Sequence, residues 1–131
     1  MASEFEDIKI VSFDDKATYK SDASSALMHC VLDLSASAPF EWSNYFNQRW
    51  KHHFYMMQRN ASVSERRLEI YCVPEELQQH HIPELNKVIA ETNKAYREHL
   101  AKTQQKASQV AAAEASERTK LAEMKAGLKF D

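Results

Sequence analysis

Alternating apolar and polar positions predict two good strands in this chain. In residues 26–34 every even position is apolar, and the odd positions include His29 and Asp33. Residues 68–73 repeat the same alternation. Because successive side chains of a strand point to opposite faces of a sheet, each strand should present one face to a core and the other partly to solvent.

Two weaker strands are predicted beside these. The β-branched and aromatic run Ile8–Phe13 reads as a strand, and Asp14–Lys16 follows it as a turn, since Asp tolerates turn geometry. Residues 14–24 are polar and should form a loop. Val63 belongs to a short strand that should turn at Ser64–Arg66.

A helix with an aromatic face is predicted from Phe40 onward. Large side chains recur there at spacings of three and four, which place them on one side of a helix. Ser37 is the candidate N-cap, and Pro39 is tolerated in the first helical turn. The predicted face consists of Trp42, Tyr45, Phe46, Arg49, Trp50, His53 and Phe54.

A second, longer helix is predicted from Glu84, after a helix start at Pro74 and an interruption at Pro83. Val110 is the only large apolar side chain in residues 101–120, although alanine keeps helix propensity high there. Residues 101–126 are therefore a protruding helical arm, a partner-stabilised helix or a frayed tail. The predicted core stripe is Leu85, Val88, Ile89, Thr92, Tyr96 and Leu100, and a small docking patch is Leu121, Met124 and Leu128.

The order of these elements predicts an α+β fold. Consecutive strands with short connections favour a small antiparallel sheet of three to four strands, packed by the aromatic helix and the long C-terminal helix. We expect residues 1–100 to form one α+β domain. Residues 101–131 should be an Ala/Lys/Gln-rich helical arm or a partly disordered tail.

The glycine content excludes several kinds of site. The 131 residues contain one glycine, Gly127. A phosphate-binding loop, a dinucleotide fingerprint and a nucleophile elbow all need glycines at fixed positions, so none of them is present. We expect no cofactor.

Charge and apolar runs bear on the compartment. Residues 1–50 hold 8 acids and 4 bases, residues 51–100 hold 7 of each, and residues 101–131 hold 4 acids and 6 bases. The acidic N-terminus lacks the apolar stretch of a signal peptide, and no run approaches the roughly 20 apolar residues of a membrane span. We expect a cytoplasmic protein that does not enter a membrane.

Histidines and cysteines supply the only candidates for metal or nucleophilic chemistry. The pairs His52–His53 and His80–His81 are adjacent, and neighbouring side chains on a helix diverge too far to hold one ion. Cys30 and Cys72 fall on the apolar faces of their strands, unlike reactive cysteines, which are partly exposed. The acids, including Glu75, Glu76, Glu84 and Glu91, are expected on exposed helix faces or in loops. We expect surface or boundary histidines, no metal and no catalytic set, although a small metal- or Cys/His-dependent enzyme remains an alternative.

A basic and aromatic segment offers a second alternative, nucleic-acid binding. Residues 49–67 mix bases with aromatic rings, which is the composition of sites for single-stranded nucleic acid. The simpler interpretation is an aromatic helix face with a solvated charged rim. The candidate binding residues are Arg49, Lys51, His52, Arg59, Arg66 and Arg67.

The function that these observations favour is a non-catalytic protein-interaction or regulatory module. Its helix continues beyond what the domain can bury, and isolated helices are marginally stable in water. We expect it to act through its sheet and helix surface and its C-terminal helix, on a protein partner or on itself as a homo-oligomer. The candidate residues on the helix are Tyr96, Leu100, Val110, Leu121 and Met124.

Overall fold

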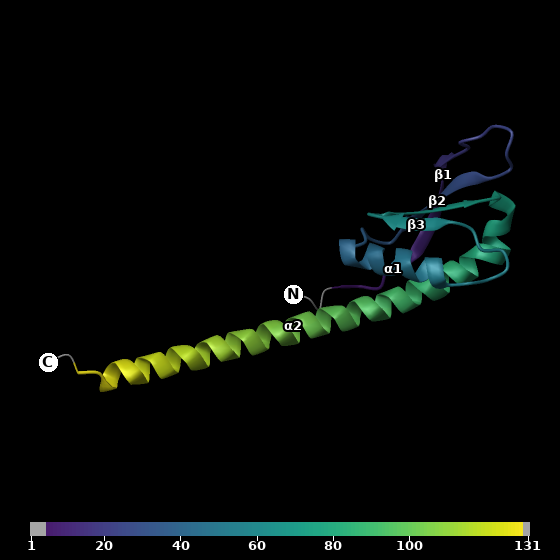
Figure 1. Ribbon diagram of the computed structural model, residues 1–131. Coiled ribbons are helices and arrows are strands. Elements are labelled where there is room, and N and C mark those ends of the chain that lie inside the picture. Colours follow the sequence, from purple (N-terminus) through teal and green to yellow (C-terminus); the bar gives the residue numbers. More distant parts are fainter. Residues whose placement is uncertain (1–4, 130–131) are drawn as a thin grey trace. The chain divides into compact units, whose positions relative to one another are not determined.

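The computed structural model describes residues 5–129 and has an α+β fold, as predicted (Figure 1). Four strands form one antiparallel sheet in the order β1-β2-β4-β3. The strands are β1 (Ile10–Tyr19), β2 (Met28–Leu34), β3 (Ala61–Ser64) and β4 (Arg67–Cys72). The helices are α1 (Phe40–His52), the 3-10 helix η2 (Pro74–Glu76), the π-helical turn η3 (Leu77–His81) and α2 (Ile82–Gly127).

The core lies between one face of the sheet and the two α-helices. The alternation predicted for β4 is confirmed, because every second residue of that strand is buried. On β2 the predicted core residues Cys30, Leu32 and Leu34 are buried, and Val31 on the opposite face is buried as well. Three aromatic rings of α1 and the first four turns of α2 cover this face. The helical residues of the core are Trp42, Phe46, Trp50, Leu85, Val88, Ile89, Thr92 and Tyr96.

Strand β1 is longer than predicted, and the turn expected at Asp14–Lys16 is wrong. The chain bulges there instead of turning, since the register with β2 shifts between Asp14 and Tyr19. The Asp14 carboxylate accepts a hydrogen bond from Ala17 N, and Thr18 Oγ1 donates to Asp14 O. Asp14 makes the local hydrogen bonds that aspartate typically makes in turns, but it makes them within the edge strand β1.

Helix α1 begins at Phe40 as predicted, but its N-cap and its C-terminal end differ from the prediction. Pro39 occupies the N-cap position and no side chain caps the helix, so the prediction of Ser37 as N-cap is wrong. The helix ends at His52, and Phe54 beyond it is 87% exposed instead of joining the aromatic face. Phe54 follows Trp50 at the helical spacing of four residues, so the sequence pattern extends beyond the point where the helix ends.

The hairpin between β3 and β4 turns without glycine. Val63 and the turn at residues 64–66 were predicted, and Ser64 pairs with Arg67 across the turn. Glu65 takes a positive φ of 55°, the left-handed conformation that glycine adopts at no steric cost. With no glycine before residue 127, the turn places this strain on a glutamate.

Two asparagines of the helices pair with the edges of the sheet. Asn47 on α1 accepts from Val63 N (2.8 Å) and donates to Val63 O (3.4 Å). Asn93 on α2 accepts from Ile8 N and donates to Ile8 O, both at 3.0 Å. Ile8 lies two residues before β1. Asn47 therefore satisfies backbone groups that would otherwise lie open at the β3 edge, and Asn93 does the same for the segment that leads into β1.

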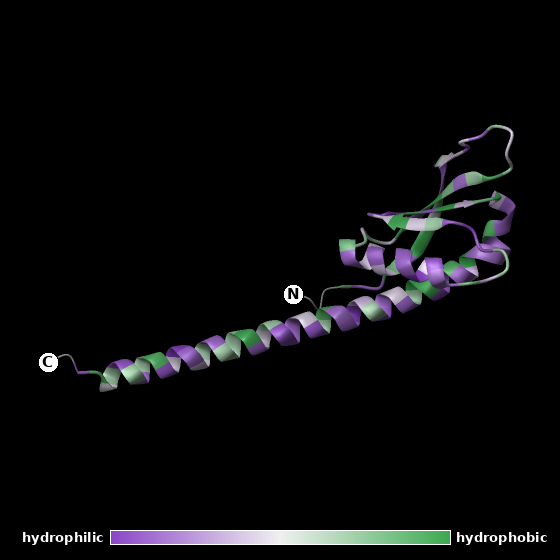
Figure 2. Cartoon of the chain, in the orientation of Figure 1, coloured by the Kyte–Doolittle hydropathy of each residue, from purple (hydrophilic) through white to green (hydrophobic). Residues whose placement is uncertain are grey.

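The chain divides into two compact units, Phe5–Arg97 and Glu98 onward. The predicted ranges 1–100 and 101–131 include residues 1–4 and 130–131, which lie outside the described residues. In the second unit every side chain from Ala101 to Lys129 is exposed, and hydrophilic and hydrophobic positions are interspersed along the helix (Figure 2). Among residues 5–129, no helix is both long and apolar enough to cross a membrane.

Candidate functional site

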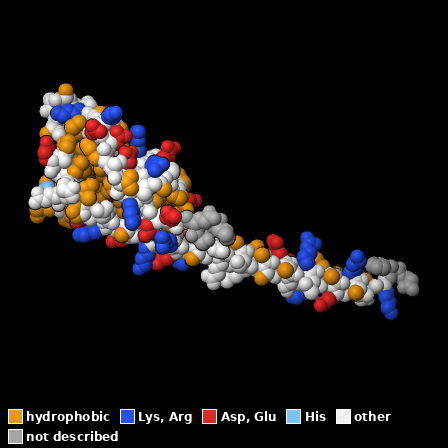
Figure 3. Space-filling view, turned by 180° about the vertical axis from the view of Figure 1, so that it is seen from behind, with side chains coloured by type: hydrophobic (Ala, Val, Ile, Leu, Met, Phe, Trp, Pro, Cys, Tyr) orange, Lys and Arg blue, Asp and Glu red, His pale blue; other side chains and the backbone are white. Residues whose placement is uncertain are grey.

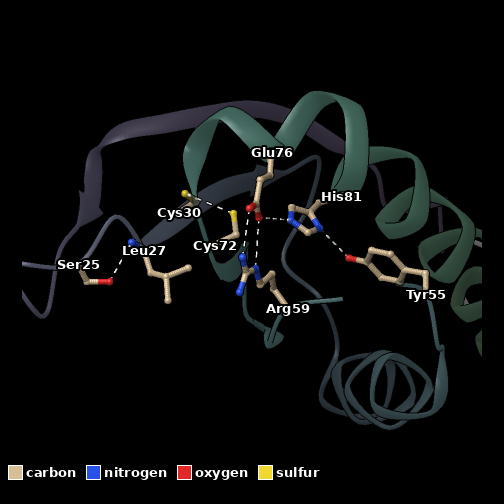
Figure 4. A network of polar contacts seen from close by, with 8 residues as sticks. All are labelled: Ser25, Leu27, Cys30, Tyr55, Arg59, Cys72, Glu76 and His81. Carbon is tan, nitrogen blue, oxygen red and sulfur yellow. Dashed lines mark hydrogen bonds and ion pairs between the residues drawn. The ribbon is translucent and has the colours of Figure 1, made fainter. Parts of the chain in front are cut away.

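Four polar side chains form a continuous network where the loop after α1 meets η2 and η3 (Figure 4). Glu76 accepts two hydrogen bonds from the Arg59 guanidinium, at 3.1 and 3.3 Å. Its Oε1 also lies 3.0 Å from His81 Nε2, and His81 Nδ1 lies 2.7 Å from the Tyr55 hydroxyl. The loop, the 3-10 helix and the π-helical turn are thus held to one another by charge-assisted bonds.

The π-helical turn explains how Glu76 and His81 meet. In η3 the N–H of Ile82 bonds to Leu77 O, five residues back. This wider turn brings residues five apart in the sequence onto the same side, whereas an α-helix does so for residues three or four apart. The geometry is local to this turn, since α2 begins at Ile82.

The buried nitrogen and oxygen atoms of these side chains all have hydrogen-bond partners. His81 is completely buried, and the Glu76 side chain is 16% exposed. The bonds from Arg59, and then the one from His81, lower the pKa of Glu76 to about 2. Burial raises the pKa of Tyr55 above its usual range, and the charge of Glu84 adds to the effect. A phenol held neutral in this way is a hydrogen-bonding group and a poor nucleophile.

Two acids and one histidine lie elsewhere than predicted. Glu76 and Glu84 were expected on exposed helix faces, but their side chains are only 16% and 19% exposed. Glu84 Oε1 contacts His53 Nε2 at 3.0 Å, and bonds from Lys87 and His53 lower its pKa. His81 was expected at the surface or boundary and is instead in the core. The contact between Glu76 and His81 was not predicted, because helical periodicity indicates contacts between residues three or four apart and these two are five apart.

The six predicted basic residues do not gather at one place. Arg59 belongs to the polar network at one end of the β3–β4 hairpin, whereas Arg66 and Arg67 lie at its turn. Arg66 donates to Leu34 O and Ser35 O, and Arg67 lies 3.8 Å from Asp14. These three guanidinium groups therefore make contacts within the domain.

The other three predicted residues come from α1. Arg49 lies over the Tyr45 ring, 5.7 Å from its centroid. Lys51 and His52 are exposed in the last turn of the helix. Lys51 and Arg59 line one hollow together with Trp50, so the structure brings these two bases near each other, whereas Arg66 and Arg67 lie at the hairpin turn.

The cysteines occupy the positions predicted for them. Both are buried and unoxidised, and Cys72 Sγ donates to Cys30 Sγ at 3.9 Å (Figure 4). This bond and burial raise the pKa of Cys72, which opposes formation of a thiolate. Within residues 5–129, no group of three His, Cys, Asp or Glu side chains is placed to hold a metal ion.

The outer face of the sheet carries a stack of rings that the sequence analysis did not single out. His29 lies between Tyr19 and Tyr71, with ring centroids 4.6 and 4.5 Å away. Its ring nitrogens lie 3.3 Å from Glu69 and 3.2 Å from Ser21. The His29 and Tyr71 positions were predicted to face away from the core, but Tyr19 was placed in a loop, so the stack could not be foreseen.

The residues predicted for partner binding fall into two groups along α2. Tyr96 is buried and Leu100 is half-buried. Val110, Leu121 and Met124 are exposed by 51%, 50% and 56% of their surface. The second group is therefore available to another molecule over about half of each side chain.

Comparison with protein families, with curated proteins and with solved structures finds no match for this chain.

Proposed function

We propose that this protein is a non-catalytic protein-interaction module whose C-terminal helix binds another polypeptide chain. The observation that carries the proposal is a continuous helix that runs to Gly127 and exposes every side chain from Ala101 onward. Isolated helices are marginally stable in water, because their stability in proteins comes mostly from packing an apolar face. A helix of this kind gains stability when a partner covers that face.

The internal chemistry of the first unit supports the same interpretation. Its most perturbed carboxylate, Glu76, is saturated by Arg59 and His81, and its buried side-chain nitrogens and oxygens all have partners among the described residues. Catalytic groups need a vacant bond or a proton to exchange with a substrate. The network is better suited to holding the loop after α1 in place.

Site-specific photo-crosslinking in living cells tests this function. A benzoylphenylalanine at Leu121 of the full chain should form covalent adducts with a protein when the cells are irradiated. The matched control is the same group at Ala112, which lies on another face of the helix and should give few adducts. Absence of protein adducts at Val110, Leu121 and Met124 alike would contradict the proposal.

A further inference from the structure

The two edges of the sheet are not equally protected. At the β3 edge, Asn47 bonds to the outward N–H and C=O of Val63. On the other side, Asn93 bonds to Ile8, two residues before β1. No side chain of residues 5–129 bonds to the backbone of Ile10, the first residue of the strand. An open edge of this kind is a template on which another chain can add a strand.

The register of β1 shows which way the backbone of Ile10 points. Ile10 lies opposite Leu34 of β2, but Leu34 N donates to Arg66 O on the β4 side. One residue earlier, Lys9 N donates to Ser35 Oγ and Lys9 O accepts from Ser35 N. Because successive residues of a strand turn their N–H and C=O to opposite sides, those of Ile10 point away from β2.

A groove lies beside this part of the backbone. Its volume is about 550 Å³, which is within the usual range for ligand sites, and it is bounded by residues 7–10 and by residues 86–97 of α2. Ile8 and Ile89 are buried and supply the apolar part of its lining. All of these residues belong to the first compact unit. The groove is therefore a feature of one folded body.

The charges that line the groove are mostly basic. They are those of Lys9, Lys94 and Arg97, with Asp7 as the one acid. Arg97 forms an ion pair with Asp7, whereas neither lysine has an ion-pair partner within residues 5–129. On the face of the first unit seen in Figure 3, basic side chains lie beside hydrophobic and acidic ones. Two unpaired ammonium groups favour an occupant that carries carboxylates.

An extended peptide can use both the backbone and the charges. In an antiparallel pair, the residue directly opposite Ile10 exchanges two hydrogen bonds with it and has its side chain on the same face of the sheet. That face is the core face, because Ile8, two residues earlier, is buried. The opposing side chain would lie toward Ile89 and should be apolar. Its neighbours in the peptide point to the other face, as Lys9 does, so acidic residues suit those positions.

We propose that the edge of β1 beside α2 binds an acidic, extended segment of another protein, which adds to the sheet as a fifth strand antiparallel to Ile10. Apolar and acidic residues alternate in the segment that fits best. This site is separate from the proposed function of the C-terminal helix, since its groups all lie within residues 5–97.

Fluorescence anisotropy of the full chain tests the ligand class. A short fluorescein-labelled peptide of alternating glutamate and valine should bind saturably, and salt should weaken the binding because exposed charges are screened. The matched control is a peptide of alternating lysine and valine, which should bind little. Absence of saturable binding by the acidic peptide, or equal binding of the two, overturns the proposal.

Methylation of the peptide nitrogens tests strand addition. The valine N–H groups are those that face Ile10 in the proposed pairing, so methylating them should weaken binding by about tenfold or more. Methylating the glutamate nitrogens, which face away, should change it little. Equal effects of the two, or displacement of the peptide by citrate at the same concentration, would show recognition of charge alone and overturn strand addition.

Charge reversal in the protein locates the site. Lys9→Glu combined with Lys94→Glu should weaken binding of the acidic peptide about tenfold. The matched control is Lys102→Glu with Lys106→Glu, which makes the same change of charge on exposed residues outside the groove and should bind normally. An equal loss in the two variants contradicts a site at this edge. Self-association of the chain that excludes the peptide would assign the edge to a second copy and overturn the proposal.

Discussion

Asn93 shows how a polar side chain becomes part of a hydrophobic core. It is 6% exposed, and its Oδ1 accepts from both Ile8 N (3.0 Å) and Trp42 Nε1 (2.9 Å). Its Nδ2 donates to Ile8 O. One amide thus joins α2 to α1 and to the segment before β1. A buried polar group is tolerated when its bonds are made, and it is costly when they are not.

Replacing Asn93 should therefore destabilise the protein strongly. Asn93→Leu leaves the indole N–H of Trp42 and both backbone groups of Ile8 without their partner. We expect a loss of about 2–4 kcal/mol in the free energy of unfolding, measured by urea denaturation. Asn86→Ala, on the exposed side of the same helix, should change it by less than about 0.5 kcal/mol. Similar losses for the two variants would contradict this account.

Glu76 should make stability depend on acid. Its folded pKa is about 2, below its ordinary value of 4.5. A carboxyl with a lowered folded pKa stabilises the protein above its unfolded pKa, and this contribution is lost as pH falls through the folded value. We expect the wild type to lose stability between about pH 5 and pH 2.

Glu76→Gln isolates this contribution. The variant keeps the shape of the side chain but cannot carry the charge that Arg59 and His81 bind. It should be less stable than the wild type by about 1–3 kcal/mol at pH 7. The difference should shrink toward pH 2 in thermal or urea unfolding. A difference that is constant with pH would show that the charge of Glu76 contributes nothing.

At the scale of single elements, the β3 edge of the sheet depends on helix α1. Val63 turns its N–H and C=O away from β4, and Asn47 of α1 bonds to both. An open edge strand is a template for pairing with another chain. Helix α1 therefore covers one face of the sheet and also satisfies unpaired backbone groups of the edge strand β3.

Asn47→Ala should expose that edge. Loss of the two bonds should lower the free energy of unfolding by about 1–2 kcal/mol, and the unpaired strand should promote aggregation on warming. Urea denaturation and light scattering measure the two effects. Asn44→Ala, on the exposed side of α1, should show neither of them, so equal aggregation of both variants would count against a role for the edge.

Elements with strong periodicity could be predicted from the sequence, and irregular ones could not. The strand at β2, the strand at β4 and the stripe of α2 up to Tyr96 alternate or repeat regularly, and each was found. The bulge in β1 was missed because Asp14 makes the same local bonds in a bulge as in a turn. The network of Glu76 and His81 was missed because it depends on a π-helical turn, for which the sequence has no repeating pattern.

At the scale of the whole molecule, the chain consists of two compact units that differ in how they are stabilised. Residues 5–97 bury an aromatic and aliphatic core, whereas residues 101–129 expose every side chain. The six predicted basic residues all lie in the first unit, but they form no single cluster, because they come from α1 and from both ends of the β3–β4 hairpin. The composition of a segment does not show whether its residues come together in the folded protein.

Removing residues 104–131 should separate folding from association. We expect the shortened chain to unfold cooperatively, with a free energy of unfolding within about 0.5 kcal/mol of the full chain in urea at dilute concentration. Its mass in sedimentation equilibrium should be that of one chain. Loss of the near-ultraviolet circular dichroism of Trp42 and Trp50 would show instead that the core needs the missing helix.

The position of α2 in the chain also sets the order of events during synthesis. The sheet and α1 are complete by Cys72, but the side chains that cover the sheet's remaining apolar face come from residues 85–96. At about 5–20 residues per second, the ribosome needs roughly 2–6 s to add residues 98–127 after that cover has been made. The nascent domain can therefore close its core only once residues 85–96 have left the ribosome, and the sheet and α1, which emerge earlier, wait for this part of α2 to cover them.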